Sequence, residues 1–214
     1  MRTNTKKLVL LAMMTAVAYL SVALIRIPVV LFLNYEPKDV IITTAGFLMG
    51  PMASFIISLV VAAIEMVTFS STGPIGCLMN LISSVSFACT AAAIYKRKRS
   101  MRGAILGLAA GAIAMVSVML LWNYLITPLY MGIKREEVAA LLIPAFLPFN
   151  ALKAGFNSSL TLALYKPLVS ALRRAGLIEN RPHSGAHTKT GIYLLAGGLL
   201  VTCVLLLLAL QGKI

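Results

Sequence analysis

The sequence predicts an all-α fold, a polytopic membrane helical bundle with a six-helix core and one additional transmembrane helix at its C-terminal end. Of the 214 residues, 60% are hydrophobic and only 12% are charged, which lies outside the range of soluble domains. Apolar runs long enough to cross a bilayer alternate with polar gaps. The formal net charge of +13 is concentrated in some of those gaps, as the positive-inside rule describes.

The first apolar run, residues 8–25, follows a basic N-terminus and predicts a membrane helix. We interpret it as a retained helix rather than a signal peptide, because it is longer than a signal core and similar segments follow it. The polar stretch after it, to about residue 38, predicts an outer loop. The apolar beginning of that stretch, residues 29–33, is also compatible with a segment that dips back over a cavity.

A short second helix, residues 39–50, is expected to end at the Gly50-Pro51 pair, because glycine and proline together break helices. The break carries no charge, so it predicts a tight hairpin with a third helix over residues 52–68. The fourth helix, residues 77–95, ends at the basic run KRKRSMR, residues 96–102.

A fifth helix is expected over residues 103–124, with glycines and alanines that permit close contact with another helix. Pro128 is expected to stop this helix, and an outer loop over residues 127–137 follows. The sixth helix contains the stretch from Pro144 to Asn157 and finishes near residues 172–174. The last apolar segment, residues 191–210, has no charged residue and is long enough to span a bilayer.

These elements divide the chain into three parts: a six-helix membrane domain over residues 1–174, a cytoplasmic linker over 175–190 and the additional helix within 191–214. Most Lys and Arg residues lie in the N-terminus, in residues 96–102 and in residues 173–190, whereas the expected outer loops are nearly neutral. The positive-inside rule then places the N-terminus in the cytoplasm of a multi-pass membrane protein.

The stretch from Pro144 to Asn157 carries the strongest functional signal, because Asn150, Lys153 and Asn157 interrupt an otherwise apolar run. Their spacings of three and four residues place them on one face of a helix. A lysine in the middle of a membrane helix costs about 2.5–3.5 kcal/mol on insertion scales. Lys153 should therefore face the bundle interior, a cavity or a polar ligand; the alternative is that it extends to a membrane surface.

Other polar residues are expected at a similar depth, in the outer half of the bundle. Their convergence predicts one outward-facing cavity of amides and a cation, which suits a planar solute with many carbonyls and hydroxyls. Each residue alone is explained equally well by a hydrogen bond between helices. Glu65 either pairs with Lys153 or faces the outer surface. The convergent polar residues are Asp39, Thr43, Asn80, Asn123, Asn150 and Lys153, with Trp122, Tyr124, Tyr130 and Phe149 as candidate apolar walls.

The sequence gives little support to other classes of function. His183 and His187 lie in the linker without a carboxylate or thiol neighbour, so we predict no metal site. No catalytic motif, no Walker A motif and no nucleic-acid-binding motif occurs, and we expect neither an enzyme nor a nucleic-acid partner. Ala12 and Ala16 form a small-residue pair on the first helix, which permits close contact with another helix of this protein or of a partner.

Several stretches occur in one order along residues 5–174: KKLVLLAMMTAVAYL, YEPKDVIITTAGFLMGP, TGPIGCLMN, AIYKRKRS, WNYLITPLYMG and IPAFLPFNALKAG. In this combination the chain resembles the substrate-binding S components of energy-coupling factor (ECF) transporters, and most closely the riboflavin-specific type. The final helix is a departure from the six-helix module of that family.

The resemblance implies a subunit of the bacterial cell membrane that captures riboflavin from outside. It implies assembly with a transmembrane coupling subunit and two cytoplasmic ATPase subunits, with no cofactor besides riboflavin as the transported ligand. Matching motif to motif, it implies flavin contacts from Asn123, Asn150 and Lys153, and contact of Ala12 and Ala16 with the coupling subunit. The alternatives are an S component for another vitamin or flavin and a membrane scaffold without a ligand.

Overall fold

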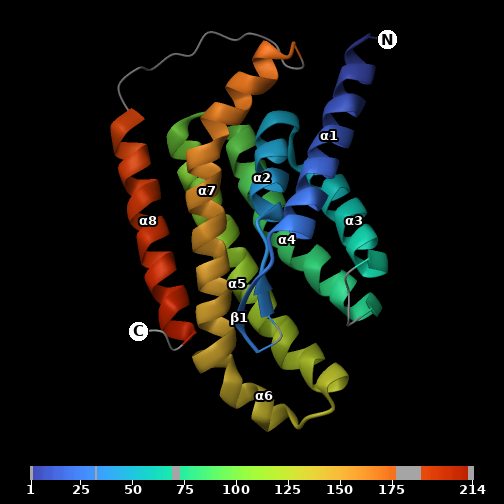
Figure 1. Cartoon of the computed structure of the whole chain (residues 1–214), viewed down its shortest axis with the longest axis vertical. Helices are drawn as coiled ribbons and strands as arrows, with labels where there is room; N and C mark the ends of the chain where they lie inside the picture. The colour runs from blue at the N-terminus through green and yellow to red at the C-terminus, as the bar shows by residue number, and fades with distance from the viewer. Residues whose placement is uncertain (1, 32, 69–72, 177–188, 212–214) are drawn as a thin grey trace.

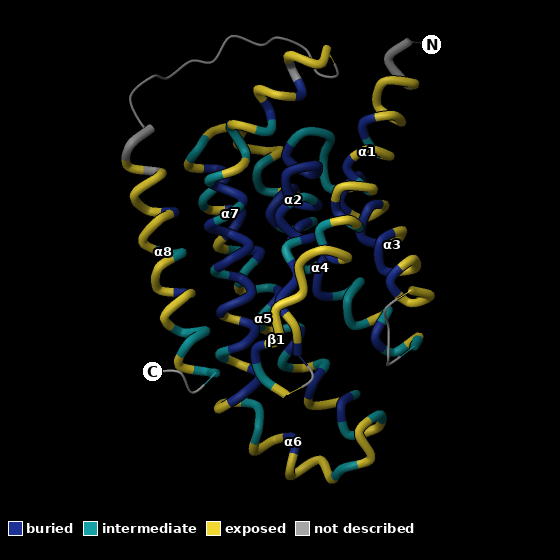
Figure 2. The backbone as a smooth tube through the Cα atoms, viewed as in Figure 1, coloured by how far each residue is buried: buried dark blue, intermediate teal, exposed yellow. Residues whose placement is uncertain are grey.

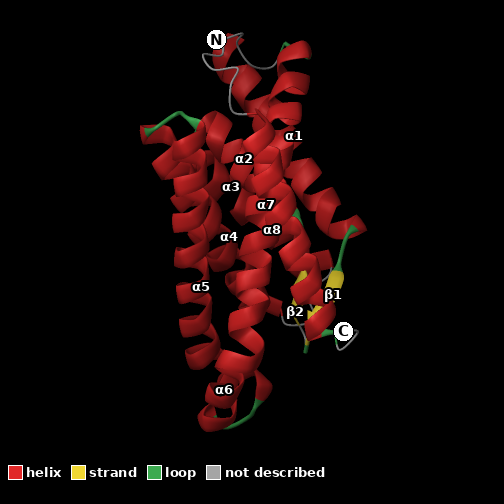
Figure 3. Ribbon diagram, turned by 90° about the vertical axis from the view of Figure 1, so that its left-hand side faces the viewer, coloured by secondary structure: helices red, strands yellow, loops and turns green. Residues whose placement is uncertain are grey.

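The computed structural model describes residues 2–31, 33–68, 73–176 and 189–211, and these form a helical bundle with a small β-hairpin at one side (Figure 1; Figure 3). Six helical segments in these ranges are long and apolar enough to cross a membrane, which confirms the all-α, multi-pass fold. The elements are α1 (Arg2–Leu24), β1 (Ile27–Val30), β2 (Leu33–Tyr35), α2 (Lys38–Met49), α3 (Pro51–Thr68), α4 (Gly73–Arg97), α5 (Met101–Met131), α6 (Arg135–Leu141), the π-helix η1 (Leu142–Phe146), α7 (Leu147–Arg174) and α8 (Lys189–Leu210).

The N-terminus, the junction between α4 and α5 and the end of α7 lie at the same end of the bundle (Figure 1). Lys6 donates a hydrogen bond to the carbonyl of Gly176 at 3.3 Å, which ties the first helix to the end of α7. We call this end, which carries residues 2–7, 96–102 and 173–176, the basic end. Residues 177–188, which include His183, His187 and most of the expected linker, lie outside the described residues.

The stretch expected to form an outer loop contains an antiparallel hairpin instead. Ile27 pairs with Tyr35 and Pro28 with Asn34. Val29 and Leu33 are buried against an apolar cluster built largely on α7, so the hairpin folds inward beside the bundle core. Burial of Val29 and Leu33 favours this inward turn, because both side chains would lose that burial if the stretch stayed in water.

Two prolines lie inside helical segments rather than at their ends. Pro128 does not stop α5, which continues to Met131 and ends at Gly132 in a left-handed conformation. A proline near the end of a membrane helix removes only one backbone donor, and neighbouring groups can compensate for it. Pro144 lies inside η1, where the backbone of Leu147 bonds to Leu142, five residues back. The span that contains the expected sixth helix therefore begins at Arg135 and includes a π-helical turn.

Glycines on α5 allow it to pack tightly against α4. A Cβ atom added to Gly107 would lie 2.7 Å from the carbonyl oxygen of Ala91, and one added to Gly111 would lie 2.5 Å from that of Phe87. These are backbone atoms in helix interiors, which cannot move aside as a side chain can. The two glycines form the small-xxx-small spacing of close membrane helix contacts.

We expect Gly111→Leu to destabilise the bundle by about 1–3 kcal/mol or more, because the new side chain must push α4 away from α5. Thermal unfolding of the protein in detergent measures this loss. Gly197→Leu is the matched control, since Gly197 is an exposed glycine of α8 with open space around it. Equal melting temperatures for the two variants would mean that α4 and α5 do not depend on this contact.

The additional helix α8 packs along α7, as Figures 1 and 3 show. Ser159 of α7 donates a 2.6 Å hydrogen bond to the carbonyl of Ala196, and Gly155 leaves room for the sulfur of Cys203. At the other end of α8, the side-chain amide of Gln211 donates to the carbonyl of Pro28 in the hairpin at 2.9 Å. The extra helix is therefore docked on the bundle, while the expected domain limits stay a prediction.

Candidate functional site

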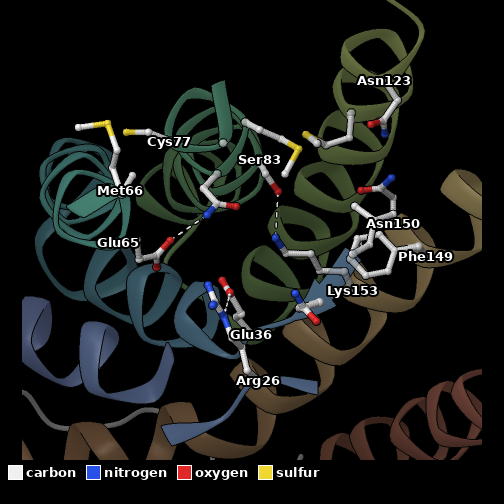
Figure 4. Close-up of a pocket in the computed structure, with 17 residues that line it drawn as sticks. Arg26, Glu36, Glu65, Met66, Cys77, Ser83, Asn123, Phe149, Asn150 and Lys153 are labelled. Carbon is white, nitrogen blue, oxygen red and sulfur yellow. Dashed lines mark hydrogen bonds and ion pairs between the residues drawn. The ribbon is translucent and has the colours of Figure 1, made fainter. Parts of the chain in front are cut away.

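A polar cavity of about 120 Å³ lies between the hairpin and helices α3, α4, α5 and α7 (Figure 4). It is the point where polar residues from distant parts of the sequence meet inside an apolar bundle. Four of the six sequence-predicted substrate-binding residues line it. The lining residues are Arg26, Leu33, Asn34, Glu36, Ala62, Glu65, Met66, Gly76, Cys77, Met79, Asn80, Ser83, Met119, Asn123, Phe149, Asn150 and Lys153.

One side of the cavity is built on a buried ion cluster centred on Lys38. Its ammonium lies 2.8 Å from Glu36 and 2.6 Å from Glu65. Arg26 donates to the same Glu36 at 2.8 Å, and Asn80 donates to Glu65 at 2.8 Å. Lys38 is only 1% exposed, so these carboxylates replace the water that its charge has lost. The cluster joins the hairpin to α2, α3 and α4.

The electrostatics of Glu36 follow from this pairing. Burial alone would raise the pKa of the Glu36 carboxyl, but the ammonium of Lys38 and the guanidinium of Arg26 outweigh burial and hold the pKa below its ordinary value. Glu36 is therefore ionised at neutral pH. Its negative charge lies at the edge of the cavity, between two cations.

A second cluster surrounds Asp39 below the cavity. Ser84 donates to one carboxylate oxygen of Asp39 at 2.5 Å, and Asn157 donates to the other at 3.1 Å. The ammonium of Lys153 lies 3.4 Å from this second oxygen and donates to Ser83 at 3.2 Å. Lys153 is 6% exposed and reaches across the cavity toward Ser83 (Figure 4), which rules out the alternative that it extends to a membrane surface.

Among the buried polar side-chain atoms without a hydrogen-bond partner, two line the cavity: Nδ2 of Asn123 and Oδ1 of Asn150. Asn150 uses its Nδ2 to donate to the carbonyl of Phe146 at 2.8 Å. A carbonyl can only accept, so this bond fixes the amide orientation and leaves the oxygen free. The oxygen of Asn123 accepts a 3.0 Å bond from Thr127. The two helices α5 and α7 thus present one unused donor and one unused acceptor to the cavity.

The structure brings Asn80, Asn123, Asn150 and Lys153 together around one cavity. Asp39 and Thr43 are not among the lining residues, because α2 turns both side chains into the bundle. Thr43 donates to the backbone carbonyl of Asp39 at 2.6 Å, and Asp39 is fully buried. Asp39 therefore reaches the cavity only through Lys153.

The expected apolar walls and the partner of Glu65 need correction. Phe149 lines the cavity, whereas Trp122, Tyr124 and Tyr130 do not. Tyr124 is partly exposed, with the guanidinium of Arg135 5.5 Å from its ring centre. Glu65 pairs with Lys38 rather than with Lys153, and it faces the cavity rather than the outer surface.

Arg26, Glu36 and Lys38 also belong to the site, although the sequence does not predict them there. They belong to a stretch whose charges are typical of a solvated loop, and their partner Glu65 lies 27 residues beyond Lys38. The available signal was the apolar run at residues 29–33, which allowed this stretch to return to the bundle. Within the described residues, no cluster of three His, Cys, Asp or Glu is placed to hold a metal ion.

Helix α1 lies at the periphery of the bundle and has one outward face, which Figure 2 shows as largely exposed. Ala12 and Ala16 are on this exposed face, whereas Leu10, Met14 and Ala18 are buried on the opposite face. The alanine pair is therefore not used in packing within the described chain. It remains accessible to a helix from another subunit.

Comparison with known proteins gives consistent similarities. Residues 6–165 match the family described as ECF transporter, substrate-specific component. The riboflavin transporter RibU of Staphylococcus aureus (strain TCH60) is 32% identical over 180 residues, covering 80% of this chain and 94% of the relative. The riboflavin transporter FmnP of Bacillus subtilis (strain 168) is 26% identical over 162 residues, covering 70% and 85%. A solved S component of a bacterial ECF transporter superposes with a TM-score of 0.67 at 32% identity, over 80% of this chain and 99% of that one.

Proposed function

The chain belongs to the family of ECF transporter substrate-specific components, and we propose that it is the riboflavin-binding subunit of a vitamin uptake transporter. It is a transport subunit and not an enzyme. In this proposal it captures riboflavin from outside the cell and releases it inward with an ATP-driven coupling module. Two riboflavin transporters among its relatives support the choice of vitamin.

The observation that carries the proposal is the pair of unused amide atoms at the cavity. The pyrimidine edge of a flavin ring alternates carbonyl acceptors with an imide N–H donor. Nδ2 of Asn123 is suited to donate to a ring carbonyl, and Oδ1 of Asn150 is suited to accept from the neighbouring imide. A ligand with this edge would satisfy two buried atoms that otherwise cost about 1–3 kcal/mol each.

The charges around the cavity favour an uncharged ligand. Arg26, Lys38 and Lys153 supply three positive charges, and their ion-pair partners Glu36, Asp39 and Glu65 supply three negative ones. The clusters are therefore formally neutral before any ligand arrives. Riboflavin adds no charge, whereas a phosphorylated flavin would bring a buried anion without a free counter-ion among the described residues. Lys153 and Asn80 are suited to meet hydroxyls of the ribityl chain.

The cavity is smaller than the ligand that we propose for it. Its volume of about 120 Å³ lies below the range of about 300–1,000 Å³ that is common for small-molecule sites. Binding must therefore move part of the lining. The hairpin is the suited element, because Asn34 in β2 and the flanking residues Arg26 and Glu36 line the cavity from one side.

We expect purified protein to bind riboflavin with a stoichiometry near one and to quench its fluorescence. The titration should be repeated with excess flavin mononucleotide or an unrelated vitamin as competitor. Direct binding of an unrelated vitamin, with no binding of riboflavin, would assign the chain to an S component for a different substrate. Binding of neither compound would favour a membrane scaffold and contradict the proposal.

We also propose that the coupling module binds this protein through α1. The exposed face that carries Ala12 and Ala16 permits the close approach of a second membrane helix. We further infer that the basic end is cytoplasmic, because Lys and Arg residues are concentrated there. The ATPase subunits would then act from the side at which α1 begins.

We expect Ala12→Trp and Ala16→Trp to spare riboflavin binding and to lower uptake by at least about tenfold. A loss of only about 1.4 kcal/mol in assembly is enough for that factor, and a large side chain at a close helix contact exceeds it easily. Uptake into whole cells and co-purification of the coupling subunit measure the effect. Ala140→Trp, at an exposed position of α6, is the matched control. Normal uptake in both α1 variants would mean that this face does not couple.

A further inference from the structure

The bundle has a second concavity, an apolar groove of about 490 Å³ between α5, α7 and α8. It is separate from the polar cavity and shares no lining residue with it. Small residues hollow it out: Ala109 and Ala112 on α5, and Ala154 and Gly155 on α7. Leu195 and Leu199 of α8 form the opposite wall. The groove therefore depends on the additional helix.

All three helices that form the groove are long and apolar enough to cross a membrane. Its lining residues, 105–117 of α5, 151–162 of α7 and Leu195 and Leu199 of α8, all lie within these apolar spans, where the surrounding medium is hydrocarbon and not water. An empty apolar groove would forfeit the dispersion contacts of the atoms that line it. The medium itself supplies a flexible apolar chain that can fill such a space.

The groove continues toward charged residues at the basic end. Its α5 wall runs from Ser117 back to Ile105, and Arg102 lies three residues before Ile105 on the same face. Its α7 wall ends at Leu162, and Lys166 follows four residues later. Arg102 is exposed and Lys166 is half-buried. Two cations thus stand where the headgroup of a lipid would lie if its chain filled the groove.

We propose that this groove binds a phospholipid with an anionic headgroup. One acyl chain lies between α5 and α8 on the floor formed by α7, and the phosphate meets Arg102 and Lys166. The site is independent of riboflavin binding. It gives α8 a role in lipid binding, since without this helix the groove would lack its outer wall.

Native mass spectrometry of the full chain tests the proposal, with phosphatidylglycerol and phosphatidylcholine of identical acyl chains as probes. Two cations near an anionic headgroup should favour phosphatidylglycerol by about 30-fold. We expect Arg102→Gln with Lys166→Gln to remove this preference. The control pair, Lys7→Gln with Lys134→Gln, removes two exposed cations away from the groove and should keep the preference.

Filling the groove is the second arm of the test. Ala112→Phe should abolish retention of both lipids, and Ala109→Phe, at an exposed position, serves if the first variant does not fold. Gly197→Phe on the open side of α8 should retain lipid. Equal retention of the two lipids by the unmodified protein, or unchanged retention in the filled variants, would overturn the proposal. The proposal would also be overturned if the filled variants lost a dimer or the bound coupling subunit instead of lipid, because the groove would then hold a protein helix.

Discussion

Asn150→Ala and Lys153→Ala are each expected to weaken riboflavin binding by about 5- to 150-fold. A ligand that leaves water must recover its hydrogen bonds inside the protein, and each partner lost there costs about 1–3 kcal/mol. Lys153 should have at least as large an effect as Asn150, because a charged donor forms the stronger hydrogen bond. Asn123→Ala should resemble Asn150→Ala if both amides meet the same ring edge.

The geometry explains why these variants should fold. Asn150 bonds to Phe146, the last residue of η1. When Lys153 is truncated, Asp39 loses its ion-pair partner but keeps the hydrogen bonds from Ser84 and Asn157. Fluorescence titration of variants with matched melting temperatures measures the affinities. Thr202→Ala is the control, because Thr202 is an exposed polar residue of α8 that bonds to its own helix. Unchanged affinity in all three cavity variants would remove these residues from the site.

Lys38→Met is expected to lower the stability of the bundle by about 3–5 kcal/mol, because it leaves two buried carboxylates without their shared partner. Glu36 and Glu65 are 6% and 2% exposed, so water does not readily replace the lost ammonium. The melting temperature in detergent should fall by roughly 6–20 °C for a chain of this size. The double variant Lys38→Met with Glu65→Gln should recover part of that loss. A single variant as stable as the unmodified protein would show that the cluster does not hold the hairpin and α3 together.

The ion cluster around Lys38 should lose stability as the pH falls. The folded protein lowers the pKa of Glu36 below its ordinary value of 4.5. Its contribution to stability is therefore fully present above that value and is lost as the pH falls through the lower, folded pKa. We expect Glu36→Gln to flatten the acid limb of the stability curve and to leave the limb above neutral pH unchanged. Thermal unfolding across a pH series measures both limbs.

The fold was predictable because long apolar runs and the distribution of Lys and Arg indicate where membrane helices lie in a sequence. The hairpin was not, because its charges find their partners only in the folded bundle. In the sequence, Arg26 and Lys38 are typical of a solvated loop. Only in the folded bundle does Glu65 of α3 lie beside Lys38. The continuation of α5 through Pro128 was also hidden, since proline near a helix end removes one bond and leaves the rest of the turn intact.

The candidate site was partly predictable for a related reason. Asn123, Asn150 and Lys153 stand out as polar residues in apolar runs, and such residues must face one another inside the bundle. Depth along a helix can be estimated from the sequence, whereas the rotation of a short helix such as α2 cannot. Asp39 and Thr43 therefore share the depth of the cavity, yet they face the bundle interior below it.

A structure of the protein with riboflavin bound tests the central claim most directly. We predict that the flavin ring occupies the cavity between the hairpin and helices α3, α4, α5 and α7. Nδ2 of Asn123 should donate to a ring carbonyl, and Oδ1 of Asn150 should accept from the imide N–H. A flavin bound in the apolar groove, or a ring whose pyrimidine edge leaves both amide atoms without a partner, would contradict the proposed site.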